Sequence, residues 1–210
     1  KNVIDMSYMF LYCSSLTSIE LSSFDTSSVI NMSNMFRHCT SIENLNLENF
    51  RTPNLEDMSD MFYECEFLTS INLINFDTSK VTNMENIFRG CDYLEELDLS
   101  NFNTANVENM SGMFYGCTSL QKLNIKNFNT EKNKDFSYMF AQTEMLEEIS
   151  VSNFNTKNSI SMEKMFADAQ MVTSLDVSNF DTSNVRDMYA MFQNCFEVTS
   201  LDVSHFNTSL

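Results

Sequence analysis

The hydrophobic positions of this chain recur every 26 residues, and no insertion or deletion breaks the register. A phenylalanine column begins at Phe24 and a threonine column at Thr26, and both run through eight units. A third column lies near the start of each unit and consists of Met6, Met32, Met58, Met84, Met110, Phe136, Met162 and Met188. Self-similarity at a fixed period of about 20–50 residues is typical of solenoids and related arrays. The pattern therefore predicts a single repeat domain over residues 1–210, built from eight 26-residue units.

The first part of each unit carries a helical pattern. Met6, Met9, Phe10 and Cys13 stand at i, i+3, i+4 and i+7, which is one face of a helix. Asp5 precedes this stripe, and Asn or Asp is a preferred N-cap. The same place is held by Asn31, Asp57, Asn83, Asn109, Asp135 and Asp187. At the other end stand residues that tolerate the left-handed conformation of a helix C-terminus, namely Gly90, Gly116 and Asn194. We therefore expect a helix of about two turns in each unit, which would be marginal in isolation.

The second part of each unit carries a strand pattern. Ile19 and Leu21 alternate with the polar residues Ser18 and Glu20, and a turn over residues 23–26 follows. Stacked units would bury one continuous core, with their strands about 4.8 Å apart in a parallel sheet. The expected fold class is an α/β solenoid of eight coils, each with a short strand and a short helix.

Three segments resemble known bacterial repeats. Residues 94–102 (LEELDLSNF) resemble the leucine-rich repeat core, with Phe102 where that core usually has Asn or Cys. Residues 113–120 (MFYGCTSL) resemble the BspA-like leucine-rich repeat. Residues 179–185 (NFDTSNV), with the following Met188 and Phe192, are similar to the 26-residue bacterial surface-protein repeat. The resemblance covers all eight units. It implies an extracellular or cell-surface protein that is often linked to adhesion, and it carries over no catalytic residue.

The charge of the chain restricts the classes of partner. There are 29 acidic and 12 basic side chains, which give a formal net charge of -17. This balance disfavours nucleic acids and anionic lipid surfaces, because both are bound by Lys and Arg. It is compatible with a basic partner. The sequence contains no apolar run of 18 residues and no signal peptide, so direct membrane insertion is not expected. Because the chain begins in mid-pattern, we interpret it as a fragment of a longer surface protein.

The cysteines predict packing rather than chemistry. Five of them form an unbroken column and the sixth follows two gaps; the column is Cys13, Cys39, Cys65, Cys91, Cys117 and Cys195. Neighbouring side chains of such a column run parallel instead of converging, which disfavours disulfides. We expect free, buried thiols that act as small hydrophobes. No CxxC motif occurs, and His38 and His205 are the only histidines, so neither a zinc site nor another cofactor is expected. Neither histidine has an evident catalytic partner, and we expect no enzymatic activity.

Other recurring residues also have structural interpretations. The methionine column alternates with phenylalanine at inward positions and predicts core packing. The threonine column predicts stacked hydroxyls that satisfy the turn backbone. A similar role is expected for Asn49, Asn75, Asn101, Asn127, Asn153 and Asn179. A calcium ladder would need acidic clusters and glycine-rich turns, which the repeat lacks. Units six and seven depart from the columns and are expected to pack less tightly, because they carry Asn133, Thr143, Ser159 and Ala169.

Specific function is expected in the outward positions that differ between units. In a repeat protein the sheet face is a common binding surface. The candidate binding face consists of Ile74, Glu96, Asp98, Lys122, Lys126 and Glu148. The hypothesis is that units three to five bind a protein or a host-surface macromolecule. A merely solvated face and a passive spacer remain alternatives, and the lack of an evident polar cap leaves end-to-end self-association open.

Overall fold

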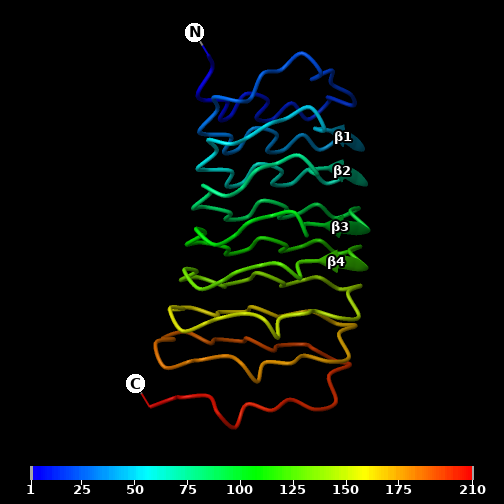
Figure 1. Ribbon diagram of the computed structural model, residues 1–210. Helices are drawn as coiled ribbons and strands as arrows, with labels where there is room; N and C mark the ends of the chain where they lie inside the picture. Colours follow the sequence, from blue (N-terminus) through cyan, green and yellow to red (C-terminus); the bar gives the residue numbers. More distant parts are fainter. Residues whose placement is uncertain (1, 210) are drawn as a thin grey trace.

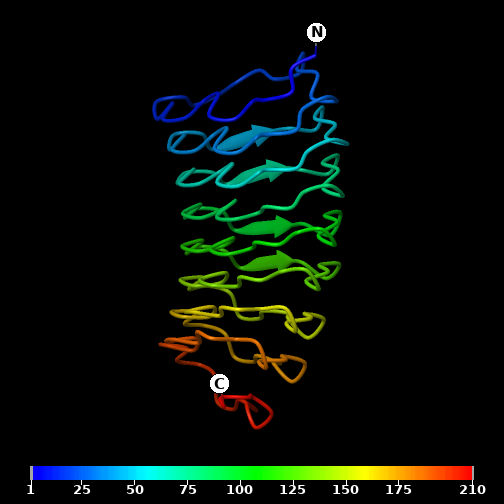
Figure 2. The same cartoon turned by 90° about the vertical axis from the view of Figure 1, so that its left-hand side faces the viewer.

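The computed structural model describes residues 2–209, which wind into a stack of coils with the two termini at opposite ends (Figure 1). Four strands lie one above another along one side: β1 (Asn44–Asn46), β2 (Ser70–Asn72), β3 (Glu96–Asp98) and β4 (Lys122–Asn124). Their arrows point the same way in Figure 2. β1 pairs in parallel with β2, and β3 with β4, and each residue faces the one 26 positions later. The predicted coil length and parallel pairing are therefore confirmed.

The sheet is less continuous than the sequence predicts. Among residues 2–209 only the second to fifth coils contain named strands, and these form two two-stranded sheets instead of one eight-stranded sheet. The sixth and seventh coils are joined by an isolated parallel bridge between Glu148 and Ser174. Each named strand is three residues long, and in β1 and β3 only the central leucine is buried. Strands this short make few hydrogen bonds to the neighbouring coils, so the pairing is interrupted along the stack.

The helix prediction is wrong. Residues 2–209 contain no helix, and each expected helix is instead a run of tight turns, which we call the turn run (residues 6–13 in the first coil). In every turn run the third and seventh residues have positive φ, as at Tyr8 (58°) and Tyr12 (60°). A right-handed helix needs φ near about −63° throughout. Positive φ at every fourth residue therefore excludes a helix in all eight coils.

The hydrogen bonds of the turn run explain why it imitates a helix in sequence. Every second N–H bonds within the coil, as when Met9 donates to the carbonyl of Met6 at 3.4 Å. The N–H groups between them bond to the next coil, as when Phe10 donates to the carbonyl of Met35 at 2.9 Å. This conformation repeats every four residues, so the first, fourth, fifth and eighth residues point inward. Those are the same positions, i, i+3, i+4 and i+7, that mark one face of a helix.

The residues expected to cap helices bond as predicted but begin turn runs instead. The amide of Ser7 donates to Oδ1 of Asp5 at 2.8 Å, and the amide of Ser33 donates to Oδ1 of Asn31 at 2.8 Å. A bond to the amide two residues on is an Asx turn. The backbones of these residues also form parallel bridges from coil to coil. Gly90, Gly116 and Asn194 adopt the expected positive φ, but they do so as the seventh residues of turn runs.

The core is formed by the inward columns. Phe88, Phe114 and Phe140 are fully buried, and their rings stack with centroid distances of 6.1 and 5.6 Å. The methionines from Met32 to Met162 in the Met6 column are also fully buried, so the prediction that this column packs in the core is confirmed. Buried aromatic and aliphatic side chains contribute the largest hydrophobic stabilisation per residue. The residues that recur in the sequence are therefore those whose side chains pack against the equivalent residues of neighbouring coils.

The sixth coil contains a buried polar defect. Asn133 is fully buried where six other coils have Val or Leu, and its Nδ2 donates to the carbonyl of Asp135 at 3.0 Å. Its Oδ1 has no hydrogen-bond partner. In the seventh coil, Ser159 is equally buried, and its hydroxyl donates to the carbonyl of Ser161 at 3.2 Å. An unpaired buried acceptor costs about 1–3 kcal/mol, so Asn133 weakens the sixth coil.

We expect Asn133→Val to raise the free energy of unfolding by about 1–2 kcal/mol, because it replaces an unpaired buried carbonyl by an apolar group. The carbonyl of Asp135 keeps the N–H of Met110 as a donor at 3.3 Å. Urea denaturation of the two proteins measures the difference. The reciprocal change Val107→Asn, in the same column of the fifth coil, serves as the control and should destabilise. A less stable N133V protein would contradict this interpretation.

Candidate functional site

The predicted binding face lies on the outer side of the strands, and we call it the sheet face. Glu96 on β3 and Lys122 on β4 form an ion pair across the two coils. The hydrogen bond that Lys122 donates to Glu96 raises the pKa of the Lys122 ammonium group. A shallow groove of about 250 Å³ lies over these strands, between Glu96, Asp98, Lys122 and Asn124. Both charged side chains are largely exposed, so the pair contributes little to stability and leaves its atoms accessible to a partner.

The remaining candidate residues of the binding face do not form one cluster. Asp98 accepts the N–H of Ser100 at 2.8 Å, and bonds from the Ser100 hydroxyl and amide lower the pKa of its carboxyl group. The charge of Lys126 also acts on Asp98. Ile74 is 65% exposed, and Glu148 borders a separate hollow together with Asp176. The structure thus brings Glu96 and Lys122 together as an ion pair, whereas Asp98 and Lys126 form none, and it places Glu148 in a different hollow.

The threonine column joins each coil to the next. The hydroxyl of Thr104 donates to the carbonyl of Asn129 at 2.9 Å and accepts the N–H of the same residue at 2.8 Å. The same double link is made by Thr26, Thr52, Thr78, Thr130, Thr156 and Thr182. Each hydroxyl uses both its donor and an acceptor site on the next coil. These residues therefore have the structural role expected of them, and they offer no free group to a ligand.

The asparagine column before the phenylalanines also bonds between coils. Asn127 donates to the carbonyl of Ser100 at 2.7 Å, and Asn75 donates to that of Glu48 at 2.7 Å. Asn101, Asn153 and Asn179 make equivalent bonds. His205 stands in this column, and its Nε2 lies 3.0 Å from the carbonyl of Val177. His205 therefore has the same role as the asparagines of this column, which is to contact a backbone carbonyl of the preceding coil.

All six cysteines are free thiols. Cys39, Cys65, Cys91 and Cys117 are buried, Cys195 is half-buried and Cys13 is exposed. The thiol of Cys117 lies 3.1 Å from the carbonyl of Phe88 in the preceding coil, and the other members from Cys39 onward make the same contact. Burial raises the pKa of Cys39 to about 11 and that of Cys117 to about 12, from a model-compound value of 9.0.

This raised pKa makes stability fall at alkaline pH, because burial disfavours the thiolate form and leaves the neutral thiol unaffected. When the pH rises above about 9, the thiols of the unfolded chain ionise while the buried ones stay protonated. Stability is therefore unaffected below that pH and falls as the pH rises from there toward the folded values. A thiol that stays protonated is also a poor nucleophile.

We expect 5,5′-dithiobis(2-nitrobenzoate) to modify one thiol of the native chain quickly at pH 8, and that thiol to be Cys13, because it is the exposed member of the column. The half-buried Cys195 should follow more slowly, and the other four should react only on unfolding. Absorbance at 412 nm counts the released groups, and a sample in 6 M guanidinium chloride gives the total. Rapid release of all six groups from the native chain would contradict the buried column.

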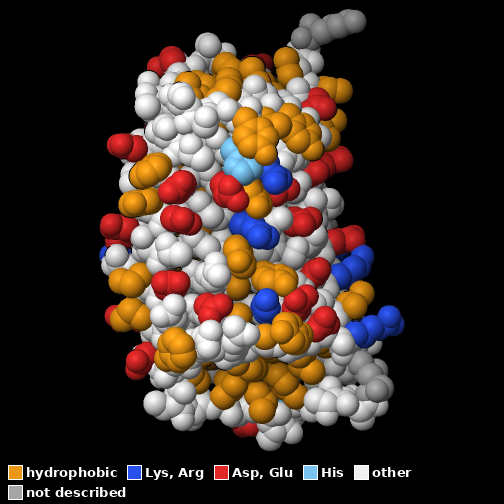
Figure 3. All heavy atoms as spheres, turned by 180° about the vertical axis from the view of Figure 1, so that it is seen from behind, with side chains coloured by type: hydrophobic (Ala, Val, Ile, Leu, Met, Phe, Trp, Pro, Cys, Tyr) orange, Lys and Arg blue, Asp and Glu red, His pale blue; other side chains and the backbone are white. Residues whose placement is uncertain are grey.

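The side chains of the turn runs form a second surface, which we call the turn face and which sequence analysis missed (Figure 3). The sixth residues of successive turn runs alternate between Arg37, Tyr63, Arg89 and Tyr115. The guanidinium of Arg37 lies 4.0 Å from the ring centre of Tyr63, and that of Arg89 lies 4.2 Å from that of Tyr115. Such cation–π contacts link neighbouring coils. The alternation is visible in the sequence once the variable columns are compared at the 26-residue period.

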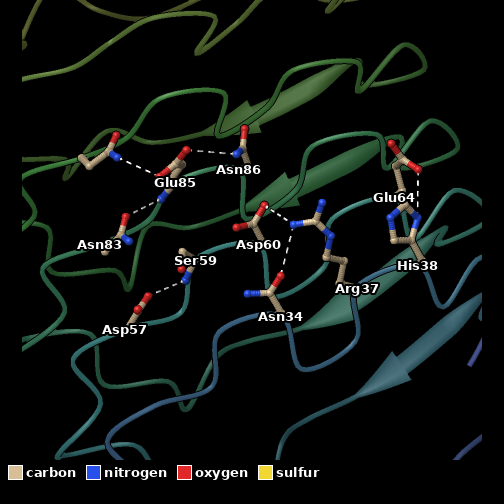
Figure 4. A network of polar contacts seen from close by, with 11 residues as sticks. Asn34, Arg37, His38, Asp57, Ser59, Asp60, Glu64, Asn83, Glu85 and Asn86 are labelled. Carbon is tan, nitrogen blue, oxygen red and sulfur yellow. Dashed lines mark hydrogen bonds and ion pairs between the residues drawn. The ribbon is translucent and has the colours of Figure 1, made fainter. Parts of the chain in front are cut away.

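Polar contacts surround this stack in the second to fourth coils (Figure 4). Arg37 pairs with Asp60 at 3.1 Å, and Nδ1 of His38 lies 2.9 Å from Glu64. Burial raises the pKa of Asp60, and the charge of Arg37 only partly offsets this effect. Burial and the nearby Asp60 raise the pKa of Glu85 in the same way. These side chains are largely occupied with one another.

Beside this network the turn face is hollowed. A groove of about 280 Å³ is lined by Glu64, Glu66, Asp92 and Tyr115, among others, and also by Gly90 and Gly116. A Cβ on Gly90 would lie 2.9 Å from Cγ of Glu64, and φ at Gly90 is +70°. Both the conformation and the close approach favour glycine at this place. Side chains are therefore absent where the groove is deepest in the fourth and fifth coils.

Residues 2–209 offer neither a metal site nor a membrane-spanning helix. No cluster of three or more His, Cys, Asp or Glu side chains there has an arrangement that could hold a metal ion. Nor do these residues form a helix that could span a bilayer.

Comparison with known proteins gives the family of the chain. Among solved structures, it is similar to a leucine-rich repeat protein of T. pallidum, with 19% identity, a TM-score of 0.41, and coverage of 69% of this chain and 72% of that one. It is also similar to a leucine-rich repeat protein of Leptospira interrogans, with 15% identity, a TM-score of 0.40, and coverage of 77% of this chain and 37% of that one. No curated protein matches the sequence. One family matches over residues 1–72, 66–172 and 123–210, which together include every residue. The chain therefore belongs to the family described as "Mycoplasma protein of unknown function, DUF285".

Proposed function

We propose that this chain is a non-enzymatic repeat module that binds a protein or another host-surface macromolecule through the sheet face of its third to fifth coils. One observation carries the proposal. The threonine, asparagine and cysteine columns are engaged between coils, whereas the outward residues of β3 and β4 differ from coil to coil and stay accessible. A rigid scaffold with variable outward positions is the usual construction of a repeat binding surface.

The sheet face offers both charge and apolar surface to a partner. Glu96 and Lys122 present opposite charges side by side, and Ile74, which follows β2, exposes 65% of its surface. The resemblance of residues 113–120 to BspA-like repeats supports a place at the cell surface and a role in adhesion. The family has no assigned function, so these two points rest on the resemblance.

A passive spacer is the second candidate, and the character of the sheet face favours it. Outside the charged pairs, the outward strand positions are small polar residues, such as Asn44 and Asn46 on β1 and Ser70 and Asn72 on β2. A spacer needs only a soluble face of this kind, because its function is to hold another domain at a distance.

The test is binding of the purified chain to immobilised extracellular-matrix proteins, measured by surface plasmon resonance. We expect saturable binding to at least one of them, weakened at least tenfold by the double variant Lys122→Glu/Lys126→Glu. The matched control Lys80→Glu/Lys157→Glu changes the net charge equally at exposed lysines outside the sheet face and should change the affinity less than twofold. Absence of saturable binding, or equal loss in both variants, would reject the sheet-face proposal.

A further inference from the structure

Two exposed aromatic residues lie next to each other at the edge of the turn face, in a column where other coils have serine. Phe67 and Tyr93 are 42% and 50% exposed, and their rings stack with a centroid distance of 4.9 Å and an interplanar angle of 19°. The corresponding residues of the first, second and fifth coils are Ser15, Ser41 and Ser119. Core packing therefore does not require an aromatic side chain at this column. The two adjacent rings form a flat apolar platform in water, which usually marks a contact surface.

Each aromatic residue directly follows a carboxylate that lines the groove described above. Glu66 precedes Phe67 and Asp92 precedes Tyr93, whereas Thr40 and Thr118 hold the carboxylate position in the coils on either side. The third and fourth coils thus share an acid–aromatic dipeptide at a place where no other coil has one. Hydrophobic side chains and carboxylates lie side by side on this face in Figure 3.

The carboxylates of the groove have unused capacity to pair with a cation. Within residues 2–209, neither Glu66 nor Asp92 has an ion-pair partner. Arg89 borders the groove, but its guanidinium lies over the ring of Tyr115 at 4.2 Å. Burial, together with the charges of Glu66 and Glu64, raises the pKa of Asp92. A positive group that enters the groove would relieve this repulsion.

We propose that the groove between Glu66 and Asp92, with the platform of Phe67 and Tyr93 beside it, is a docking site for an arginine- or lysine-bearing segment of a partner protein. Charge complementarity selects this occupant: the chain carries a net charge of -17, and the groove adds three carboxylates beside an aromatic platform. Guanidinium and ammonium groups pair with carboxylates and are also attracted to the faces of aromatic rings, whereas a neutral segment makes no ion pair and an acidic one is repelled. This site is separate from the sheet face and does not depend on the function proposed for it.

The probe for the test is the peptide acetyl-Arg-Gly-Arg-Gly-Arg-amide with a fluorescent label, titrated with the intact chain and followed by fluorescence anisotropy. The same peptide with citrulline in place of arginine keeps the shape and removes the charge. We expect the arginine peptide to bind and the citrulline peptide to bind at least tenfold more weakly, because the ion pairs and cation–π contacts are both lost.

Two variants separate a specific site from general attraction to an acidic protein. Phe67→Ser/Tyr93→Ser removes the platform without a change in charge, and Glu66→Thr/Asp92→Thr removes two carboxylates. The new residues are those found at the same columns in other coils, so the fold should be kept, and unchanged thermal unfolding would verify this. We expect each variant to weaken binding about tenfold. The charge-matched control Glu48→Gln/Glu131→Gln, at exposed positions that do not line the groove, should weaken it less than twofold.

Three results would overturn the proposal. One is equal weakening in the control and in Glu66→Thr/Asp92→Thr, which would show long-range attraction alone. Another is full binding by Phe67→Ser/Tyr93→Ser. If a panel of neutral oligosaccharides bound to the chain and the arginine peptide did not, the aromatic platform would be a glycan site, and the basic-segment proposal would also fall.

Discussion

Replacing Phe114 by alanine is expected to lower the free energy of unfolding by about 3–5 kcal/mol, the largest effect of any single substitution considered for this chain. Phe114 is fully buried, and its ring stacks on Phe88 at 6.1 Å and on Phe140 at 5.6 Å. Removing the ring leaves a cavity between the fourth and sixth coils. The turn runs around it are hydrogen-bonded to one another and cannot easily move together to close it. Urea denaturation followed by tyrosine fluorescence measures the loss.

The position of Phe114 adds a second expected result. In a stacked repeat, stability is a sum of coil terms and interface terms, so a defect in a central coil weakens the coupling between the two halves. The unfolding transition of F114A should therefore broaden as well as shift. Phe114→Leu should cost about 1–2 kcal/mol, because it keeps most of the apolar volume. The exposed Phe67→Ala should change stability by less than about 1 kcal/mol. A cost below about 1 kcal/mol for F114A would contradict the stacked core.

Replacing Thr104 by valine is expected to cost about 2–3 kcal/mol, although the two side chains have nearly the same shape. The hydroxyl of Thr104 satisfies both the N–H and the carbonyl of Asn129 in the next coil. Valine leaves both backbone groups without a partner at a largely buried position, where each unpaired group costs about 1–3 kcal/mol. Thermal and urea unfolding of T104V measure the effect.

The control for Thr104 is serine, which keeps the hydroxyl and loses only a methyl group. T104S should cost about 1 kcal/mol or less. If T104S and T104V were equally destabilised, the methyl group and not the hydroxyl would be the important part of the threonine column, and the coil-to-coil link would lose its energetic support.

The sequence carried most of the information about the stack but misled about the conformation within each coil. A period of 26 residues without gaps is enough to predict coils in register, and the parallel pairs of Leu45 with Ile71 and of Leu97 with Leu123 follow from it. The stripe Met6, Met9, Phe10 and Cys13 was read as a helix because a four-residue turn repeat places the same positions inward. The distinguishing signal was the enrichment of Asn, Asp and Gly at two fixed outward positions, as at Asn34, Asn86 and Gly112.

The candidate surfaces were harder to predict for a physical reason. The repeat constrains inward residues, so recurrence identifies the core and says nothing about outward contacts. The pairing of Glu96 with Lys122 follows from the register, and it was foreseeable. The groove beside Phe67 and Tyr93 was not, because it depends on where the turn run places a seventh residue such as Gly90. If that segment were a helix, as the sequence predicted, the residues that line the groove would not face it in this arrangement.

The most direct test of the turn-run account is the change in the free energy of unfolding caused by Gly112→Ala. Gly112 is the third residue of its turn run, with φ of +59°, and an added Cβ would overlap Oδ1 of Asn86. The account predicts a loss of at least about 1–2 kcal/mol, because alanine is disfavoured in the left-handed conformation. In a helix, the same residue would be interior and alanine would stabilise by about 0.5–1 kcal/mol. A more stable G112A protein would contradict the account, and a less stable one would support it.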